Sequence, residues 1–133
     1  LYEYFDLLDR ADLVNIIRTE AGNVRAFKNS KILFKSPNLY YAIALESWKR
    51  EADKGNLRES FFASQVGTRY RILSSLNTDF VVHEGQNVFE AEIGGKSKKR
   101  NQIKGLKNAC IFKDGIEIGR ADMIPLYLAG FLY

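Results

Sequence analysis

Three strand-like runs follow one another over residues 69–93, and this succession limits the fold more than any other feature. They are rich in β-branched and aromatic residues, as strands are, and read "RYRIL", "DFVV" and "VFEAEI". Glu84-Gly85-Gln86-Asn87 separates the last two, and a glycine-containing turn of this length predicts a hairpin. The sequence therefore predicts a sheet that begins with neighbouring strands.

Helical patterns flank these runs. Residues 56–66 predict a helix with Asn56 as N-cap and Glu59 as its capping-box partner. Its expected buried side chains are Leu57, Phe61, Phe62 and Val66. A basic stretch at about 98–108 is taken as a second helix, and "ACIFK" as a further strand. The predicted order from residue 56 is α-β-β-β-α-β, which indicates the α/β class.

The N-terminal part predicts a smaller unit. An amphipathic helix is expected to end near Ala11, followed by the strands "LVNIIRT" and "KILFK" with a turn at Gly22-Asn23. A helix followed by a β-hairpin is how a winged-helix unit ends. A further helix, with Asn38 as N-cap, is expected after Ser36-Pro37. We therefore divide the chain into residues 1–36 and residues 37–133.

Single cysteine and histidine residues exclude several kinds of site. Cys110 is the only cysteine and His83 the only histidine, so an internal disulfide, a Cys-cluster zinc site and a two-His metal motif are excluded. This usage suits a reducing cytoplasm. No apolar run approaches the roughly 20 residues needed to span a bilayer, and no membrane partner is expected. The first residues, "LYEYFDLLDRADLV", are typical of the middle of a helix, so we expect a piece of a longer protein.

The segment "EIGGKSKKRNQI" at residues 92–103 superficially resembles the end of a phosphate-binding P-loop. Such a loop needs a glycine five residues before Gly95, where its backbone N–H groups turn toward the phosphates. That position is Glu90. A carboxylate there would face the phosphates, so this segment is not expected to bind nucleotides.

Carboxylates around the same segment predict a different site. Glu90 and Glu92 share one face of a strand, Asp79 opens the preceding strand, and Glu59 lies on the helix. Glu59, Asp79 and Glu92, with Lys96 just beyond, form a candidate cluster for metal-assisted phosphodiester cleavage, in which the three carboxylates would be the metal ligands. Simpler interpretations stay open: Glu59 as a cap partner, Asp79 as a turn residue, and the two strand glutamates as a solvated face.

The strongest charge bias lies just beyond the glycines. Residues 96–107 contain six basic side chains and no acidic one: Lys96, Lys98, Lys99, Arg100, Lys104 and Lys107. Such a stretch can follow the phosphates of DNA or RNA. The alternative is a solvated helix face without a partner.

Four segments together resemble the C-terminal region of a group of prokaryotic predicted AAA-family ATPases. They are "GNLRESFF", "TDFVV", "FEAEIGGKSKKRNQI" and "IPLYLAGFLY". In that family a P-loop ATPase domain and a winged helix precede a C-terminal domain with a restriction-endonuclease-like fold. The resemblance covers essentially the whole chain. It implies an upstream ATPase domain that binds ATP, contacts this region and mediates any oligomer.

The PD-(D/E)xK pattern of that fold implies specific catalytic residues here. Glu59 would be the helix glutamate, Asp79 and Glu92 the strand carboxylates, and Gln102 a polar residue on the next helix. The lysine expected two residues after Glu92 is replaced by Gly94. Either Lys96 substitutes from the loop, or Glu90-Ala91-Glu92 is an E-x-E variant.

Three functions follow as hypotheses. The first is nucleic-acid binding through Lys96, Lys98, Lys99, Arg100 and Lys104, coupled to the upstream ATPase. The second is a nuclease that depends on Mg²⁺ or Mn²⁺. The third is an inactive scaffold, suggested by the aromatic end "PLYLAGFLY".

Overall fold

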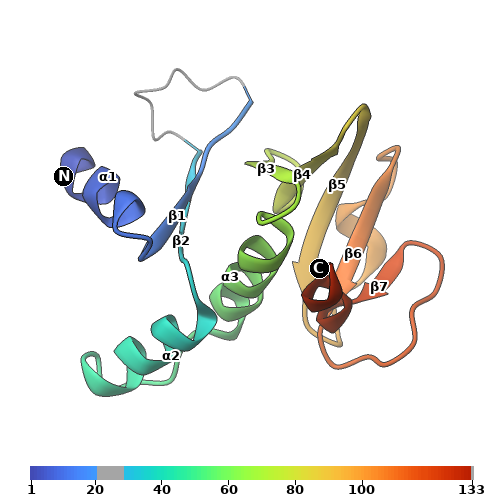
Figure 1. Ribbon diagram of the computed structural model, residues 1–133. Coiled ribbons are helices and arrows are strands. Elements are labelled where there is room, and N and C mark those ends of the chain that lie inside the picture. Colours follow the sequence, from blue (N-terminus) through green and yellow to red (C-terminus); the bar gives the residue numbers. More distant parts are fainter. Residues whose placement is uncertain (21–28, 133) are drawn as a thin grey trace.

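The computed structural model describes residues 1–20 and 29–132, which form two sheets and the helices around them (Figure 1). The predicted Gly22-Asn23 turn lies outside these residues. Within them, no helix has both the length and the apolar character needed to cross a membrane.

The N-terminal elements are a helix, a hairpin and a second helix. They are α1 (Tyr2–Arg10), β1 (Val14–Ile17), β2 (Lys31–Phe34) and α2 (Pro37–Glu46). The two strands pair antiparallel with Ile17 opposite Lys31. This confirms the predicted helix and both predicted strands. The predicted Asn38 cap is wrong, because Ser36 is the N-cap and Pro37 opens the helix, where its missing N–H costs no hydrogen bond.

The second sheet has five strands that lie side by side in chain order. They are β3 (Arg71–Ser74), β4 (Phe80–Glu84), β5 (Asn87–Gly94), β6 (Ala109–Lys113) and β7 (Met123–Pro125), and the chain continues into a 3₁₀ helix, η2 (Leu126–Phe131). β3, β4 and β5 pair antiparallel, and β5, β6 and β7 pair parallel. The α/β class and the three successive strands are confirmed. The predicted hairpin is present, with Glu84 opposite Asn87 and a positive φ of 61° at Gly85, a conformation that suits glycine.

The helix expected at residues 98–108 is wrong. The chain between β5 and β6 forms turns and one short 3₁₀ helix, η1 (Arg100–Gln102). Gly105 and Asn108 have positive φ values of 87° and 54°, which a right-handed helix does not accommodate. Ile103 is buried and fixes this segment to the protein.

Helix α3 (Lys54–Val66) lies between the N-terminal hairpin and the five-stranded sheet (Figure 1). It begins earlier than predicted, because the Asp53 side chain accepts a hydrogen bond from the backbone N–H of Asn56 and is the N-cap. Asn56 is therefore not the cap, and Glu59 is not a capping-box partner. The predicted Phe62 and Val66 are buried, whereas Leu57 and Phe61 are half-buried.

One core joins the hairpin, α3 and the sheet. Ile17 and Leu33 from the hairpin belong to the same cluster of buried residues as Phe62, Phe80 and Phe112. The rings of Phe62 and Phe80 stack with centroids 5.3 Å apart. This shared core holds one end of the hairpin against the beginning of β4, where the candidate site lies.

A candidate carboxylate–lysine site

Glu59 projects from the side of α3 that packs into the core. It lies three and four residues before the buried Phe62 and Ala63, so the three side chains share one stripe of the helix. The Glu59 side chain is only 21% exposed. The helix therefore presents this carboxylate to the sheet rather than to solvent.

Asp79 immediately precedes β4 and has two partners. One of its carboxylate oxygens accepts a hydrogen bond from the backbone N–H of Ile93 at 2.8 Å, and the other accepts one from Lys31 at 2.7 Å. The last pair of the β4–β5 ladder is Phe80 with Ala91. One residue further in the same register, Asp79 lies across from Glu92 and joins the end of β4 to β5.

Lys31 is the central residue of the site, and sequence reasoning missed it. Its ammonium donates to Glu59 at 2.6 Å and to Asp79 at 2.7 Å, so it bridges helix α3 and the residue before β4. A signal was present in "KILFK", because Lys31 alternates with the buried Leu33 and shares its face of β2. A lysine on the buried face of a strand indicates a carboxylate partner.

Glu92 is almost completely buried and pairs with Lys98. Its side chain is 3% exposed, and the Lys98 ammonium contacts it. Gly94 makes this contact feasible: a Cβ there would lie 2.6 to 2.8 Å from the stem of Lys98. The missing side chain at the position of the expected E-x-K lysine thus lets a lysine four residues later reach Glu92. The structure brings Lys98, rather than Lys96, to this carboxylate.

The three carboxylates influence one another. Burial raises the pKa of Glu59; the hydrogen bond from Lys31 opposes this, and the charges of Asp79 and Glu92 add to it. Burial likewise raises the pKa of Glu92, against the hydrogen bond from Lys98. Burial acts to lower the pKa of Lys31, but its contacts with Asp79 and Glu59 outweigh this and the pKa is raised. Glu59, Asp79 and Glu92 therefore lie close enough for their charges to interact, and Lys31 and Lys98 are paired with them.

Glu90 belongs to a separate network. Its carboxylate accepts hydrogen bonds from the hydroxyls of Ser75 and Thr78, both at 2.6 Å, and from the amide of Asn77 at 3.3 Å. These three residues form the connection between β3 and β4. Glu90 therefore holds a loop in place and is not part of the cluster around Lys31.

The cluster, as arranged, does not fit a divalent metal ion. Within residues 1–20 and 29–132, no three Asp, Glu, His or Cys side chains are placed so that they could hold one. One oxygen of Glu59 and one of Asp79 bond to the Lys31 ammonium, and Glu92 contacts the Lys98 ammonium. The predicted ligand set of Glu59, Asp79 and Glu92 is thus paired with two cationic side chains of the chain itself.

The remaining predicted residues lie on the segment between β5 and β6. Lys96, Lys99, Lys104 and Gln102 are exposed. Arg100 pairs with Asp122. In the described part of the chain, the groups that bond to the three carboxylates are Lys31, Lys98 and the Ile93 N–H, so Gln102 is not among them.

Cys110 lies in β6 and has a structural environment. Burial, with a contribution from the charge of Asp122, raises the pKa of its thiol to about 12. The thiol therefore stays protonated at neutral pH, and a thiol in that form is a poor nucleophile.

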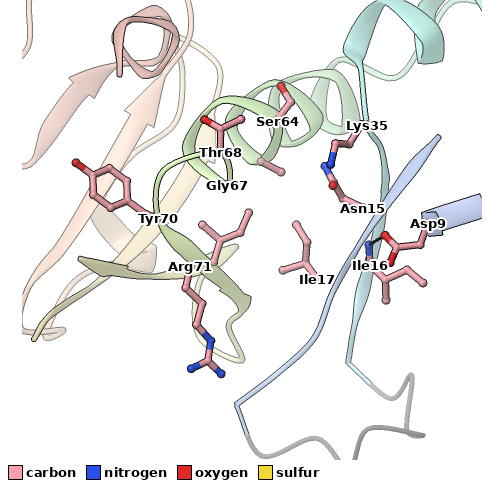
Figure 2. Close-up of a pocket in the computed structure, with 12 residues that line it drawn as sticks. Asp9, Asn15, Ile16, Ile17, Lys35, Ser64, Gly67, Thr68, Tyr70 and Arg71 are labelled. Atoms are coloured by element: carbon pink, nitrogen blue, oxygen red, sulfur yellow. Dashed lines mark hydrogen bonds between the residues drawn. The ribbon is translucent and has the colours of Figure 1, made fainter. Parts of the chain in front are cut away.

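A separate cavity of about 280 Å³ lies between the hairpin and the C-terminal end of α3 (Figure 2). Two of its charged lining residues have partners in the protein. Asp9 accepts a hydrogen bond from the backbone N–H of Ile16, and Lys35 pairs with Asp12 at 3.0 Å. The cavity does not include the carboxylate cluster.

Comparisons of the chain with protein-family models, curated proteins and solved structures found no match.

Proposed function

We propose that this chain is a nucleic-acid-binding domain with a restriction-endonuclease-like core, acting as the C-terminal part of an AAA-family ATPase. The observation that carries the proposal is the exposed basic segment between β5 and β6, which starts at the carboxylate cluster. Nucleic-acid binding is the proposed role. The ion pairs of the carboxylate cluster hold the structure next to the basic segment in place.

The basic segment divides into anchoring and free side chains. Lys98 and Arg100 pair with Glu92 and Asp122, and Ile103 is buried. Lys96, Lys99, Lys104 and Lys107 are exposed, and none of them forms an ion pair with a described residue. A segment that is fixed at three points and carries several free ammonium groups presents them together, as binding to a phosphate backbone requires.

The element order supports the proposed core. A helix, three antiparallel strands and a fourth strand parallel to the third follow one another from α3 to β6. This agrees with the α-β-β-β-α-β order that the sequence pattern predicts, except that η1 and turns replace its second helix. The upstream ATPase, its ATP and any oligomer are proposed from the resemblance alone.

Fluorescence anisotropy with labelled duplex DNA and single-stranded RNA tests the proposal. We expect binding at low salt that weakens steeply as salt rises. Replacing Lys99 and Lys104 by Ala should reduce the logarithmic salt slope by roughly 2. Lys49→Ala with Lys54→Ala removes the same charge elsewhere and should leave that slope unchanged. Absence of binding to both nucleic acids at low salt contradicts the proposal and favours the scaffold hypothesis.

A metal-dependent nuclease is the second candidate, favoured by the convergence of Glu59, Asp79 and Glu92. The present geometry opposes it, since Lys31 occupies the oxygens that a metal would need. Cleavage of DNA in Mn²⁺ that is lost in Asp79→Asn would support the nuclease. Cleavage that survives Asp79→Asn would instead come from a contaminant.

A further inference from the structure

A cleft lies between α3 and η2, beside the residue that follows β6. Its volume is about 270 Å³, and it is lined by Leu57, Arg58, Phe61, Asp114, Leu126 and Tyr127. The two charged lining residues pair with each other, since the Nε of Arg58 donates to Asp114 at 2.9 Å. The cleft therefore combines apolar and aromatic walls with one polar edge that carries both a hydrogen-bond donor and an acceptor.

Tyr127 contributes an exposed aromatic ring that is held in place. It is 49% exposed, although its hydroxyl donates to the backbone carbonyl of Glu117 at 3.0 Å. The Phe131 ring packs against it at an angle of 88°, with the centroids 6.4 Å apart. A ring that is already fixed loses little freedom when a planar group stacks on it, so less binding energy is lost to ordering.

The polar edge of the cleft borders the start of the basic segment. The Arg58 guanidinium lies against Gly95, where a Cβ would be 3.2 Å from its carbon and its two terminal nitrogens. Lys96 follows, and its Cβ lies 3.4 Å from the position that a Cβ on Gly115 would take. Gly115 is the neighbour of Asp114, so the exposed Lys96 lies next to the polar edge of the cleft.

We infer that this cleft takes one unpaired base of a single-stranded nucleic acid, which stacks on Tyr127 while the neighbouring phosphates contact the lysines of the basic segment. The inference rests on the proposed function and names its substrate class. Aromatic rings beside a positively charged track suit single strands, because every base has a face that can stack. The bases of a duplex stack on one another and do not offer that face to a protein.

The charges at the cleft orient the strand. The Asp114 carboxylate is 54% exposed and repels a phosphate, whereas the Lys96 ammonium attracts one. A carboxylate accepts hydrogen bonds and a guanidinium donates them, and the edge of a base offers partners for both. The backbone of the strand is thus directed toward Lys96, and a base toward Arg58 and Asp114.

Fluorescence anisotropy with the whole chain tests the role of the bases directly. The labelled probes are oligodeoxythymidylate, oligouridylate and an abasic deoxyribose-phosphate strand, each about 12 nucleotides long. We expect the base-bearing strands to bind at least about fivefold more tightly than the abasic strand, which carries the same phosphates. Equal affinity of the abasic strand and both base-bearing strands overturns the inference and leaves the binding proposal intact.

Variants of Tyr127 test the position of the stacked base. Tyr127→Ala should weaken the binding of both single strands at least about fivefold and leave the salt slope unchanged, because it removes a ring but no charge. Binding to a DNA duplex should not change. Tyr127→Phe keeps the ring and should bind like the unaltered chain. Tyr41→Ala is the matched control, at an α2 tyrosine that is 51% exposed and does not line the cleft.

Unchanged single-strand affinity of Tyr127→Ala overturns the inference, and so does an equal loss of duplex affinity. Absence of binding by every probe overturns the inference together with the proposed function. Circular dichroism checks that each variant is folded. If Tyr127→Ala is unfolded, Tyr127→Leu, which keeps apolar bulk without the aromatic ring, takes its place. The abasic strand tests the inference on the unaltered chain in either case.

Discussion

The ionisation of a single side chain in this protein depends more on its partners than on its residue type. Glu90 and Glu92 lie two residues apart on one strand, yet their pKa values are shifted in opposite directions. Burial raises the pKa of Glu92 despite its lysine. At Glu90, burial also acts to raise the pKa, but the hydrogen bonds from Ser75, Thr78 and Asn77 together outweigh it and the pKa is lowered.

The lowered pKa of Glu90 predicts a pH-dependent contribution to stability. Its ionised form is favoured in the folded chain, so this contribution is present above the ordinary pKa of glutamate, about 4.3. It is lost as the pH falls through the lower pKa of the folded state. We expect Glu90→Gln to reduce the free energy of unfolding by about 1 kcal/mol at pH 7 and by less at pH 3.5.

Urea unfolding at both pH values measures this difference. Glu46→Gln is the control, because Glu46 is 83% exposed and contacts only Lys49 at 3.9 Å. An effect of Glu90→Gln that is equal at both pH values would show that the hydrogen bonds do not depend on the charge.

At the scale of the elements, the turn after β5 depends on Gly94, because the absence of a side chain there leaves space for the stem of Lys98. We expect Gly94→Ala to destabilise the fold by about 2 kcal/mol, since its Cβ would displace the Lys98 stem and leave the buried Glu92 without its counter-charge. Chemical denaturation of a double-mutant cycle checks the cause. Gly94→Ala should cost little in a chain that already carries Lys98→Ala, because the two residues act together.

Gly130→Ala provides the control for the cycle. A Cβ at Gly130 would lie 3.4 Å from Phe61, an ordinary contact. Additive effects of Gly94→Ala and Lys98→Ala would contradict the interpretation, because the glycine would then be needed for a reason unrelated to the lysine.

Local sequence patterns were sufficient to predict the strands but not the structure of the segment between β5 and β6. The alternation over β3 to β5 and the turn at Gly85 depend on neighbours in the sequence, and both predictions are confirmed. The helix expected at 98–108 failed because basic side chains there are fixed by distant partners, including Asp122. Lys31 was missed for the same reason: its carboxylates lie 28 and 48 residues away.

The candidate site was likewise predictable from the sequence only in part. Asp79 and Glu92 were selected from the strand pattern and Glu59 from the helix pattern, and the resemblance selected all three; in the structure their charges interact, but each carboxylate is paired with a lysine. Which lysine reaches Glu92 was decided by the space above Gly94, a property of the folded backbone that no spacing rule contains. Exposed Lys96 was nearer to the expected position, but Lys98 makes the contact.

At the scale of the whole molecule, the division into residues 1–36 and 37–133 stays a prediction. The shared core indicates that the stability of each part depends on the other. Ile17 and Leu33 are buried in the cluster that contains Phe62 and Phe80. The backbone N–H of Ser74 in β3 also donates to the carbonyl of Arg18, directly after β1. Residues of the hairpin thus complete the packing of α3.

We therefore expect the chain to unfold in one transition, and Leu33→Ala to lower its free energy of unfolding by about 2–4 kcal/mol. Trp48, the only tryptophan, packs near Phe34 and Tyr40 and reports on the region around β2 and α2. Its fluorescence and the far-ultraviolet circular dichroism should give the same denaturation midpoint. Leu76→Ala, at a side chain that is 78% exposed, is the control.

A fragment of residues 37–133 gives the sharper comparison. It lacks Ile17 and Leu33, and it leaves Glu59 and Asp79 without the Lys31 ammonium. We expect it to melt at a clearly lower temperature than the whole chain, because it lacks two side chains of the shared core and leaves two partly buried carboxylates without their counter-charge. A fragment that melts at the temperature of the whole chain would mean that the hairpin does not support the core.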